Sequence, residues 1–366
     1  MDSKFQVSLE KAALQHHLSR EEIILLLRAQ PGKEQNELFA MADRIRERYQ
    51  GDEVHLRGII EFSSYCRNDC HYCGLRCSNN NINRYRFSVE QLVNASCQAV
   101  ELGYNTIVLQ SGEDPWYDAD SLSRLITEIK KKKNVAITLG IGERSKEEYR
   151  QLHQAGADRF LLKHETTDAE LFNKLRPGTS SDKRMQCLRW LREIGYQVGS
   201  GNMVGLPGQT LESLADDILF LKELDVEMAG IGPFIPHSQT PLADVPNGDL
   251  QLTLNTLAVA RLLLPYCHLP ATTATGTLHP EGRQMALNCG ANVIMPNVTP
   301  YDYRQLYQIY PNKAGSTDDP KQSLKKIVSI INQVGRKVSE GRGDTPKPSF
   351  QIKSQNSVFL NDKHSN

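Results

Sequence analysis

The sequence predicts an α/β fold, a complete (β/α)8 TIM-type barrel preceded by helices, and two observations support this prediction. Eight short runs rich in β-branched and aromatic residues alternate with seven helical stretches, which is the pattern of βαβ units in a parallel sheet. Polar residues also follow these runs, including the last two, and a β/α barrel places its active site at the carboxyl ends of its strands. An incomplete barrel of six strands is the alternative, in which the last two runs are not strands.

The same pattern divides the chain into four parts. These are a helical extension in residues 1–50, the barrel in 51–315, a C-terminal helix in 316–342 and a disordered tail in 343–366. The extension contains a helix-start signal, Ser19 followed by Glu22, and is expected to close one end of the barrel. The tail is expected to be disordered because Gly, Asp, Pro, Lys, Ser and Asn dominate it.

Residue preferences give the position of each element in the barrel. The eight predicted strands are Val54–Phe62, Thr106–Gln110, Val135–Leu139, Arg159–Leu162, Gln197–Val204, Met228–Ile231, Leu269–Thr273 and Val293–Met295. The seven predicted helices are Val89–Leu102, Asp120–Lys132, Lys146–Ala155, Lys183–Ile194, Leu211–Leu224, Gln251–Leu264 and Glu281–Cys289. Because strands and helices take turns, the connections are expected to be βαβ crossovers.

Charge and composition argue against several classes of protein. Lysine plus arginine and aspartate plus glutamate both number 43, so the formal net charge is zero, which argues against a nucleic-acid partner. No run of 18 apolar residues is present, so no membrane span is expected. Residues 1–15 lack the apolar core of a secretory signal, and eight cysteines fit a reducing compartment, so the expected location is the cytoplasm.

Three cysteines follow the first predicted strand. Cys66, Cys70 and Cys73 have the spacing C-x3-C-x2-C, and Tyr72 precedes the last of them. Thiolates at this spacing on a loop can converge on one soft metal centre. Three ligands would leave one iron of a 4Fe–4S cube open for a small molecule. The alternative is a four-cysteine zinc or iron–sulfur site that includes Cys77, although zinc sites favour paired C-x2-C motifs.

The cysteine loop resembles the signature of the radical S-adenosylmethionine (radical SAM) superfamily. In that superfamily the open iron binds the amino and carboxylate groups of S-adenosylmethionine. An electron from the cluster then cleaves the sulfonium to give a 5′-deoxyadenosyl radical. The resemblance implies one 4Fe–4S cluster and S-adenosylmethionine as cofactors.

Other strand ends carry residues that suit such a cofactor. The second strand leads into Ser111-Gly112-Glu113, which resembles the superfamily's Gly-Gly-Glu stretch apart from the serine. The fourth leads into Lys163-His164-Glu165, where three ionisable groups are costly to bury unless they are satisfied. Glu165 is expected to accept a hydrogen bond from the ribose or ammonium of the cofactor. Arg184, at the start of the next helix, is expected to pair with its carboxylate through a bidentate fork.

The sixth and seventh strand ends offer further contacts. The backbone of Met228–Ile231 is expected to flank adenine. Thr272 and Thr273 end the seventh strand, where their hydroxyls could meet an anionic or polar substrate. Simple β-propensity explains the two threonines equally well.

Longer motifs extend the resemblance beyond the superfamily. They are Tyr-Cys-Arg-Asn-Asp-Cys-x-Tyr-Cys-Gly-Leu-Arg from Tyr65, Gly-Asn-Met-Val-Gly-Leu-Pro-Gly-Gln-Thr from Gly201, Gly-Pro-Phe-Ile-Pro-His from Gly232 and Ala-Asn-Val-Ile-Met-Pro-Asn-Val-Thr-Pro from Ala291. Across residues 19–342 the sequence resembles HydE, the radical SAM maturase of iron-iron hydrogenase. This group is close to the biotin synthase and methylornithine synthase families.

The HydE resemblance implies a complete barrel of the radical SAM class that encloses a cavity. The implied cluster ligands are Cys66, Cys70 and Cys73. The implied S-adenosylmethionine site comprises Tyr72, Ser111, Gly112, Glu113, Glu165, Arg184, Met228 and Ile231. The implied substrate site comprises Arg57, Gln110, Thr138, Lys163, Thr272, Thr273, Met295 and Tyr303.

The resemblance also implies an activity and partners. The deoxyadenosyl radical would attack the cysteine sulfur of an iron carbonyl-cyanide precursor, on the way to the diiron subcluster of the hydrogenase H-cluster. Another hydrogenase maturase would deliver this precursor, and an external electron donor would reduce the cluster. Cys267 and Cys289 stand alone, so no second cluster is expected. Lys163 stands where an arginine is more usual, so anion binding there is expected to differ.

Three alternatives stay open on the sequence. A methylornithine-synthase-like mutase shares the barrel and most of the cofactor site. A biotin-synthase-like enzyme would need a second, sacrificial cluster, and its cysteine ligands are not found at the strand ends. A non-catalytic metal carrier would not need the polar residues at those ends.

Overall fold

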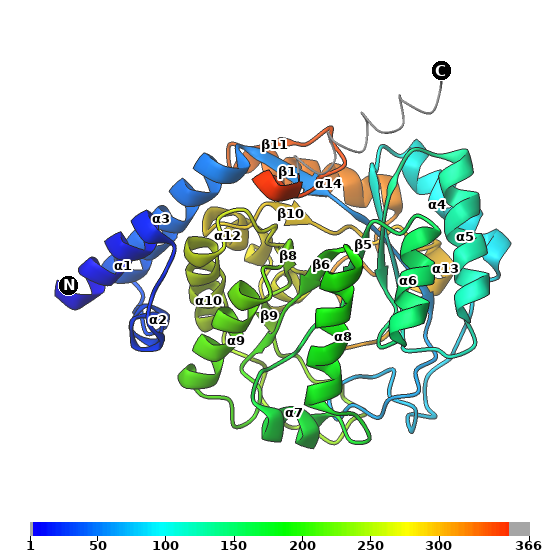
Figure 1. Ribbon diagram of the computed structural model, residues 1–366, viewed down its shortest axis with the longest axis horizontal. Coiled ribbons are helices and arrows are strands. Elements are labelled where there is room, and N and C mark those ends of the chain that lie inside the picture. The colour runs from blue at the N-terminus through cyan, green and yellow to red at the C-terminus, as the bar shows by residue number, and fades with distance from the viewer. Residues whose placement is uncertain (1–2, 351–366) are drawn as a thin grey trace.

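The structure is a computed structural model and describes residues 3–350. A six-stranded sheet, with strand order β2-β3-β4-β5-β6-β8, lies in its interior (Figure 1). Its strands are β2 (Gly58–Ser63), β3 (Thr106–Ser111), β4 (Ala136–Gly140), β5 (Arg159–Leu161), β6 (Gln197–Ser200) and β8 (Met228–Ala229). Every pairing in this sheet is parallel, which confirms the α/β prediction.

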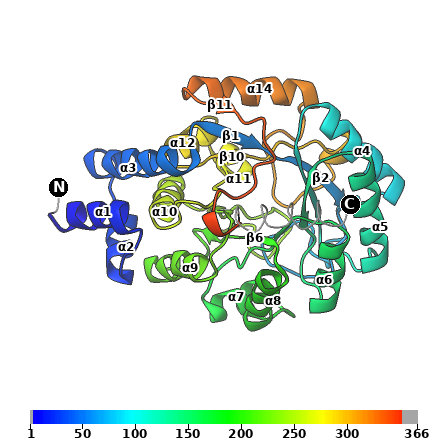
Figure 2. The ribbon, with the colours of Figure 1, turned by 45° about the horizontal axis from the view of Figure 1, so that its top comes forward.

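Helices cover the outside of the sheet (Figure 2). They are α4 (Val89–Glu101), α5 (Ala119–Lys132), α6 (Lys146–Gln154), α8 (Ser181–Ile194), α9 (Leu211–Glu223) and α10 (Leu250–Leu263). Capping boxes at Ser88, Ser145 and Thr210 start three of them, since each side chain satisfies a free amide of the first turn. The apolar core lies between these helices and the strands.

The first predicted strand is two strands in the structure. β1 (Glu53–Leu56) pairs in parallel with β10 (Val293–Ile294) and β11 (Lys337–Val338), whereas β2 pairs with β3. Arg57 stands between β1 and β2, and its amide donates to Ile294 O at 3.0 Å. The prediction of one continuous strand was wrong because the chain changes sheets at Arg57.

The fifth predicted strand is also interrupted, and the sixth is shorter than predicted. The chain leaves β6 and forms β7 (Met203–Val204), and it leaves β8 and forms β9 (Gly232–Pro233). β7 and β9 pair with each other outside the main sheet. Gly201, between β6 and β7, has φ 153° and lies against the backbone of Gly230, so only a residue without a side chain fits there.

Residues 269–273 do not form the predicted seventh strand. Isolated parallel bridges join Met228 to His268, and Pro270 to Val293. Thr272 then caps α11 (Thr273–Leu278), so the chain turns into a helix where the strand was expected to end. A further parallel bridge joins Ile59 of β2 to Asn297.

Three helices precede the sheet. They are α1 (Ser3–Gln15), α2 (Arg20–Leu27) and α3 (Lys33–Gln50), of which α1 was not predicted. Arg20 pairs with Asp216 of α9 at 2.6 Å, and Gln35 donates to Asn255 of α10 at 2.8 Å. These helices therefore pack against α9 and α10 (Figure 2), and the expectation that they close an end of the barrel was wrong.

The remaining helices come after β5, after α11 and after β10 in the chain. They are α7 (Ala169–Leu175), α12 (Gly282–Asn288), α13 (Tyr301–Arg304) and α14 (Pro320–Gln333). The sequence predicted α12 and α14 but not the short α7 and α13. No helix within residues 3–350 is long and apolar enough to cross a membrane.

The segment after β11 crosses the amino ends of the strands. Thr106, the first residue of β3, donates to Arg342 O at 2.7 Å. Arg159 and Gln197, the first residues of β5 and β6, donate to the Asp344 carboxylate at 2.5 and 2.9 Å. The segment therefore covers the end of the sheet opposite the carboxyl ends of the strands.

This packing corrects the prediction of a disordered tail in residues 343–366. Thr345 is 3% exposed and Lys347 is 8% exposed, so residues 343–347 are part of the packed structure. Composition misled the prediction because these polar residues satisfy buried polar groups of the strands. Residues 351–366 lie outside the described residues.

Replacing Asp344 tests how strongly this segment is held. Asp344→Ala would remove the carboxylate partner of Arg159, whose side chain is 4% exposed. We expect the free energy of unfolding to fall by about 2 kcal/mol, because a buried guanidinium would lose its counter-charge. Urea denaturation measures the change, with Asp182→Ala at an exposed position of α8 as the control. An equal effect of both substitutions would contradict the expectation.

Candidate functional site

One arginine holds the cysteine loop in place. The Arg84 guanidinium donates to the carbonyls of Ser64, Leu75, Arg76 and Asn79 at 2.6, 3.3, 2.8 and 3.0 Å. These acceptors lie on both sides of the three cysteines in the sequence. A planar group with five donors suits such a task, and it fixes the shape of the loop through its backbone.

Two glycines let other segments approach the loop closely. A Cβ on Gly112 would lie 2.1 Å from Tyr65 O and 2.9 Å from Cys66 Cβ. A Cβ on Gly74 would lie 2.1 Å from Gln308 O and 2.6 Å from the ring of His237. Side chains are therefore excluded at both positions, and the loop is in contact with the end of β3 and with residues 308–309.

A cavity of about 390 Å³ opens at the carboxyl ends of the strands. Ser111, Gly140 and Leu161, the last residues of β3, β4 and β5, are in its wall. The wall also includes most of the residues singled out from the sequence. These are Cys66, Cys70, Tyr72, Cys73, Gln110, Ser111, Gly112, Glu113, Lys163, Glu165, Arg184, Met228, Thr272, Thr273 and Met295.

The chemistry of the three thiols fits an iron–sulfur cluster. They border one cavity, but among the described residues no three His, Cys, Asp or Glu side chains are grouped as around a single metal ion. In a cluster each cysteine binds a different iron, so the sulfurs need not meet at one point. Burial raises the pKa of Cys66 to about 11 and also raises the pKa values of Cys70 and Cys73. The free thiols are therefore protonated at neutral pH, and binding of a metal would release the protons.

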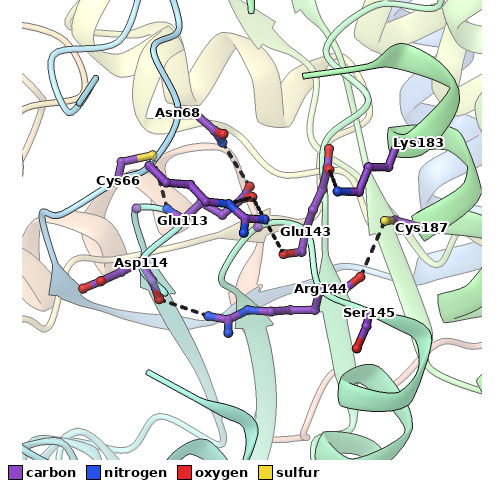
Figure 3. Close-up of polar contacts among 12 residues, drawn as sticks. Cys66, Asn68, Glu113, Asp114, Glu143, Arg144, Ser145, Lys183 and Cys187 are labelled. Atoms are coloured by element: carbon purple, nitrogen blue, oxygen red, sulfur yellow. Dashed lines mark hydrogen bonds and ion pairs between the residues drawn. The ribbon is translucent and has the colours of Figure 1, made fainter. Parts of the chain in front are cut away.

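Glu113 joins the cysteine loop to the end of β3 (Figure 3). Its carboxylate accepts from Arg67 Nε at 2.7 Å and from Asn68 Nδ2 at 3.0 Å, and its amide donates to Cys66 Sγ at 3.3 Å. Burial acts to raise the pKa of Glu113, but the backbone at Glu143 and the Arg67 guanidinium hold it below the ordinary value. Glu113 is therefore an anion that positions the loop.

Arg184 is already paired inside the protein. Its Nε donates to Glu143 Oε1 at 2.7 Å, and its Nη1 donates to Lys163 O at 2.6 Å. The Arg184 and Glu143 side chains are 3% and 4% exposed. Two of the five guanidinium N–H donors are thus used inside the protein, and three remain for a cofactor carboxylate.

Glu165 stands on strained backbone in the cavity wall. Its φ of 66° lies in the left-handed region that favours glycine. Its amide donates to Gly201 O at 3.0 Å, and its carbonyl accepts from Met203 N at 3.0 Å. The nearest cation to its carboxylate is Lys163 Nζ, at 3.5 Å. The backbone of one neighbouring segment, residues 201–203, thus holds this residue at the cavity.

Two residues expected in the substrate site lie on the other side of Met228. Arg57 and Thr138 border a separate cavity of about 10 Å³ together with Met228. Arg57 is 1% exposed, and its Nη1 lies 2.9 Å from Met228 Sδ. The expectation that they reach the main cavity is not met, because they stand nearer to the amino ends of the strands, with Arg57 contacting Gly343 O at 3.1 Å.

Tyr303 and Ile231 are also not part of the main cavity wall, although Gly230 and Gly232 on both sides of Ile231 are. The ring of Tyr303 packs against Tyr85 and Phe87, at centroid distances of 5.0 and 4.7 Å. Ile231 is fully buried in the apolar core. Tyr303 belongs to the short helix α13, which was not predicted, and so its direction could not be inferred.

Arg176 is in the cavity wall but was not singled out from the sequence. It is 7% exposed, and its Nη1 donates to the Tyr72 hydroxyl at 3.0 Å. The pKa of Arg176 is raised despite its burial, because Tyr72, Cys70 and Glu165 surround it. It ends α7, a helix that the sequence did not reveal.

Glu61 and Lys313 form a second group that sequence reasoning missed. They are in the cavity wall with Tyr307 and Tyr310. A signal for Glu61 was present, since it is a carboxylate inside the apolar strand β2. Lys313 comes from an irregular segment between α13 and α14, where nothing local indicates a site.

The chain is similar to a known superfamily and to several known proteins. Residues 60–221 match the Radical SAM superfamily. The FeFe-hydrogenase maturase subunit HydE of Thermotoga maritima is 54% identical over 300 residues, which cover 82% of this chain and 86% of that protein. The 3-methylornithine synthase of Methanosarcina acetivorans is 30% identical over 94% of this chain and 95% of that protein. The crystal structure of methylornithine synthase superposes with a TM-score of 0.80 and 27% identity, covering 91% of this chain and 97% of that one.

Proposed function

Because the chain belongs to the HydE family of radical SAM enzymes, we propose that it acts in the maturation of iron-iron hydrogenase. The observation that carries the proposal is the composition of one cavity wall. Three free thiols of the cysteine loop share it with the hydroxyls of Thr272 and Thr273 and the thioether of Met295. A soft-metal ligand set next to polar and thioether groups suits a reaction on a small organometallic substrate.

The proposed cofactors are one 4Fe–4S cluster, held by Cys66, Cys70 and Cys73, and S-adenosylmethionine. When bound, the cluster supplies the electron that cleaves S-adenosylmethionine to methionine and a 5′-deoxyadenosyl radical. The chain supplies placement and excludes water. The residues proposed to hold S-adenosylmethionine are Tyr72, Ser111, Gly112, Glu113, Glu165, Arg184 and Met228, with Arg176 added from the structure.

The proposed substrate is a cysteine-bound iron carbonyl-cyanide species, which a partner maturase would deliver. Gln110, Lys163, Thr272 and Thr273 offer donors for an amino-acid carboxylate. Met295 offers a polarisable thioether for the metal fragment. We propose that the substrate lies against these residues with its sulfur toward the S-adenosylmethionine site, and that an external donor reduces the cluster.

We also propose that residues 51–315 form a complete (β/α)8 barrel, with residues 316–342 as a C-terminal addition. The bridges support this closure, because they link β8 to His268, Pro270 to β10, and Asn297 to β2. The cavity supports it too, since its wall includes Ile59 of β2, Met228 of β8 and Met295. Ile59 and Met295 come from the first and last parts of the barrel sequence.

Iron analysis and a maturation assay test the proposal together. Anaerobically reconstituted protein should bind about four irons per chain and should restore hydrogenase activity when it is added to the other maturases. Cys77→Ala should keep both properties, because Cys77 is an exposed thiol, whereas Cys70→Ala should lose both. Loss of the cluster in Cys77→Ala would falsify the three-ligand assignment.

A methylornithine-synthase-like activity is the second candidate, because the 30% identity covers nearly all of that relative. Incubating the reduced protein with S-adenosylmethionine and L-lysine separates the two candidates. Formation of methylornithine would support the second, and hydrogenase maturation without it would support the first.

A further inference from the structure

A buried ion pair stands in the substrate part of the cavity wall. Lys313 Nζ lies 2.6 and 2.7 Å from the two carboxylate oxygens of Glu61. The Lys313 and Glu61 side chains are 7% and 5% exposed. Thr273 and Met295 border the same small void as this pair, at the edge of the main cavity.

The donors of Lys313 and most of the acceptor capacity of Glu61 are satisfied from within the chain. An ammonium has three donors, and the third of Lys313 goes to Tyr307 O at 3.2 Å. Glu61 also accepts from Asn297 Nδ2 at 2.8 Å. The Lys313 ammonium therefore makes the contacts with the Glu61 carboxylate that the ammonium of a bound amine would make.

The other carboxylates in the wall belong to the cofactor side. Within the described residues the wall contains three carboxylates, of Glu61, Glu113 and Glu165. Glu113 is bound to the cysteine loop, and Glu165 has Lys163 near it. Glu61 is thus the carboxylate next to Thr273 and Met295, and it is the one that an ammonium of a substrate could reach there.

We propose that Lys313 determines substrate specificity by occupying, with its own ammonium, the position at which Glu61 would bind an amine. The cavity then excludes diamino acids such as lysine and ornithine, because a second ammonium would find no free carboxylate. This inference rests on the proposed function for the kind of substrate that is admitted. It predicts that the chain does not act on basic amino acids.

The position of Lys313 suits this role. It comes from the irregular segment between α13 and α14 and not from a strand of the sheet, so its removal leaves the strands intact. In Lys313→Ala the lost atoms are those of n-propylammonium, from Cγ to Nζ. The variant is therefore expected to present an unpaired buried carboxylate beside a space of that shape.

Calorimetric titration with n-propylammonium tests the proposal without any maturation assay. Lys313→Ala should bind this probe, and the wild-type chain should bind it at least about tenfold more weakly, since a hydrogen-bonded charge contributes about that much. The double variant Glu61→Gln with Lys313→Ala is the matched control and should not bind the probe. Neutral 1-propanol should bind Lys313→Ala no better than it binds the wild type.

Two results would overturn the proposal. One is equal binding of n-propylammonium by Lys313→Ala and by the double variant, and the other is no binding by either. If Lys313→Ala is too unstable for calorimetry without the probe, its thermal unfolding midpoint is measured instead. The probe should then raise the midpoint of Lys313→Ala and leave that of the double variant unchanged, and the absence of this difference would refute the proposal.

The failure of this test and the failure of the proposed function are distinguishable. Amine binding does not depend on hydrogenase, on the cluster or on partner maturases. If the wild-type chain matures hydrogenase but Lys313→Ala does not bind amines, the proposed function stands and the proposed role of Lys313 in specificity is refuted. Titration of Lys313→Ala with L-ornithine adds a second arm, in which we expect about tenfold tighter binding than in the wild type.

Discussion

A chain with Thr272→Val and Thr273→Val is expected to cleave S-adenosylmethionine but to lose hydrogenase maturation by about 100-fold or more. Both residues are in the cavity wall, away from the cysteine loop in sequence, so the cluster should form normally. The substitutions remove two hydroxyl donors and leave the shape of the side chains nearly unchanged. Iron content, 5′-deoxyadenosine release and hydrogenase activity after in vitro maturation measure the three parts of this expectation.

The capping role of Thr272 requires a control. Its Oγ1 accepts from Thr275 N at 3.2 Å at the start of α11, so its loss is expected to cost about 1 kcal/mol of stability. Thr272→Ser combined with Thr273→Val keeps the cap and removes one hydroxyl. Full maturation by the double valine variant would remove the threonines from the proposed substrate site. If hydrogenase maturation falls only in proportion to the loss of protein stability, the two threonines have a structural role.

Arg184→Ala is expected to weaken S-adenosylmethionine binding and to destabilise the fold at the same time. Loss of a charge-assisted contact should reduce the affinity for the cofactor by about one to two orders of magnitude. Glu143, 4% exposed, would also lose the arginine that now binds it at 2.7 Å. The free energy of unfolding should therefore fall by about 3 kcal/mol. Calorimetry and urea denaturation measure the two effects separately.

A double variant separates the two effects of Arg184. Arg184→Met with Glu143→Met removes both charges and keeps apolar volume, so it should regain most of the stability without regaining cofactor affinity. Normal affinity for S-adenosylmethionine in the double variant would show that another cation binds the cofactor carboxylate. Arg176, which contacts Tyr72, would be the next candidate.

Local sequence signals predicted the six outer helices, most strands of the parallel sheet and the ligands proposed for the cluster. Their positions followed from residue patterns within ten or so positions, and the capping box at Ser19 marked the start of a helix that the structure contains. The spacing of Cys66, Cys70 and Cys73 predicted a shared site because all three lie on one short loop. Such signals depend only on neighbours in the chain, and therefore one sequence reveals them.

The tertiary structure alone decided which side chains reach the cavity. Arg57 and Thr138 looked equivalent to the residues of the cavity wall, but they lie beyond Met228. Lys313 meets Glu61 across 252 positions of the sequence, and Asp344 meets Arg159 across 185. The register of the parallel strands and the paths of irregular segments set these contacts. Since the partners are far apart in the chain, no local pattern of residues encodes their pairing, and it follows only from the packed fold.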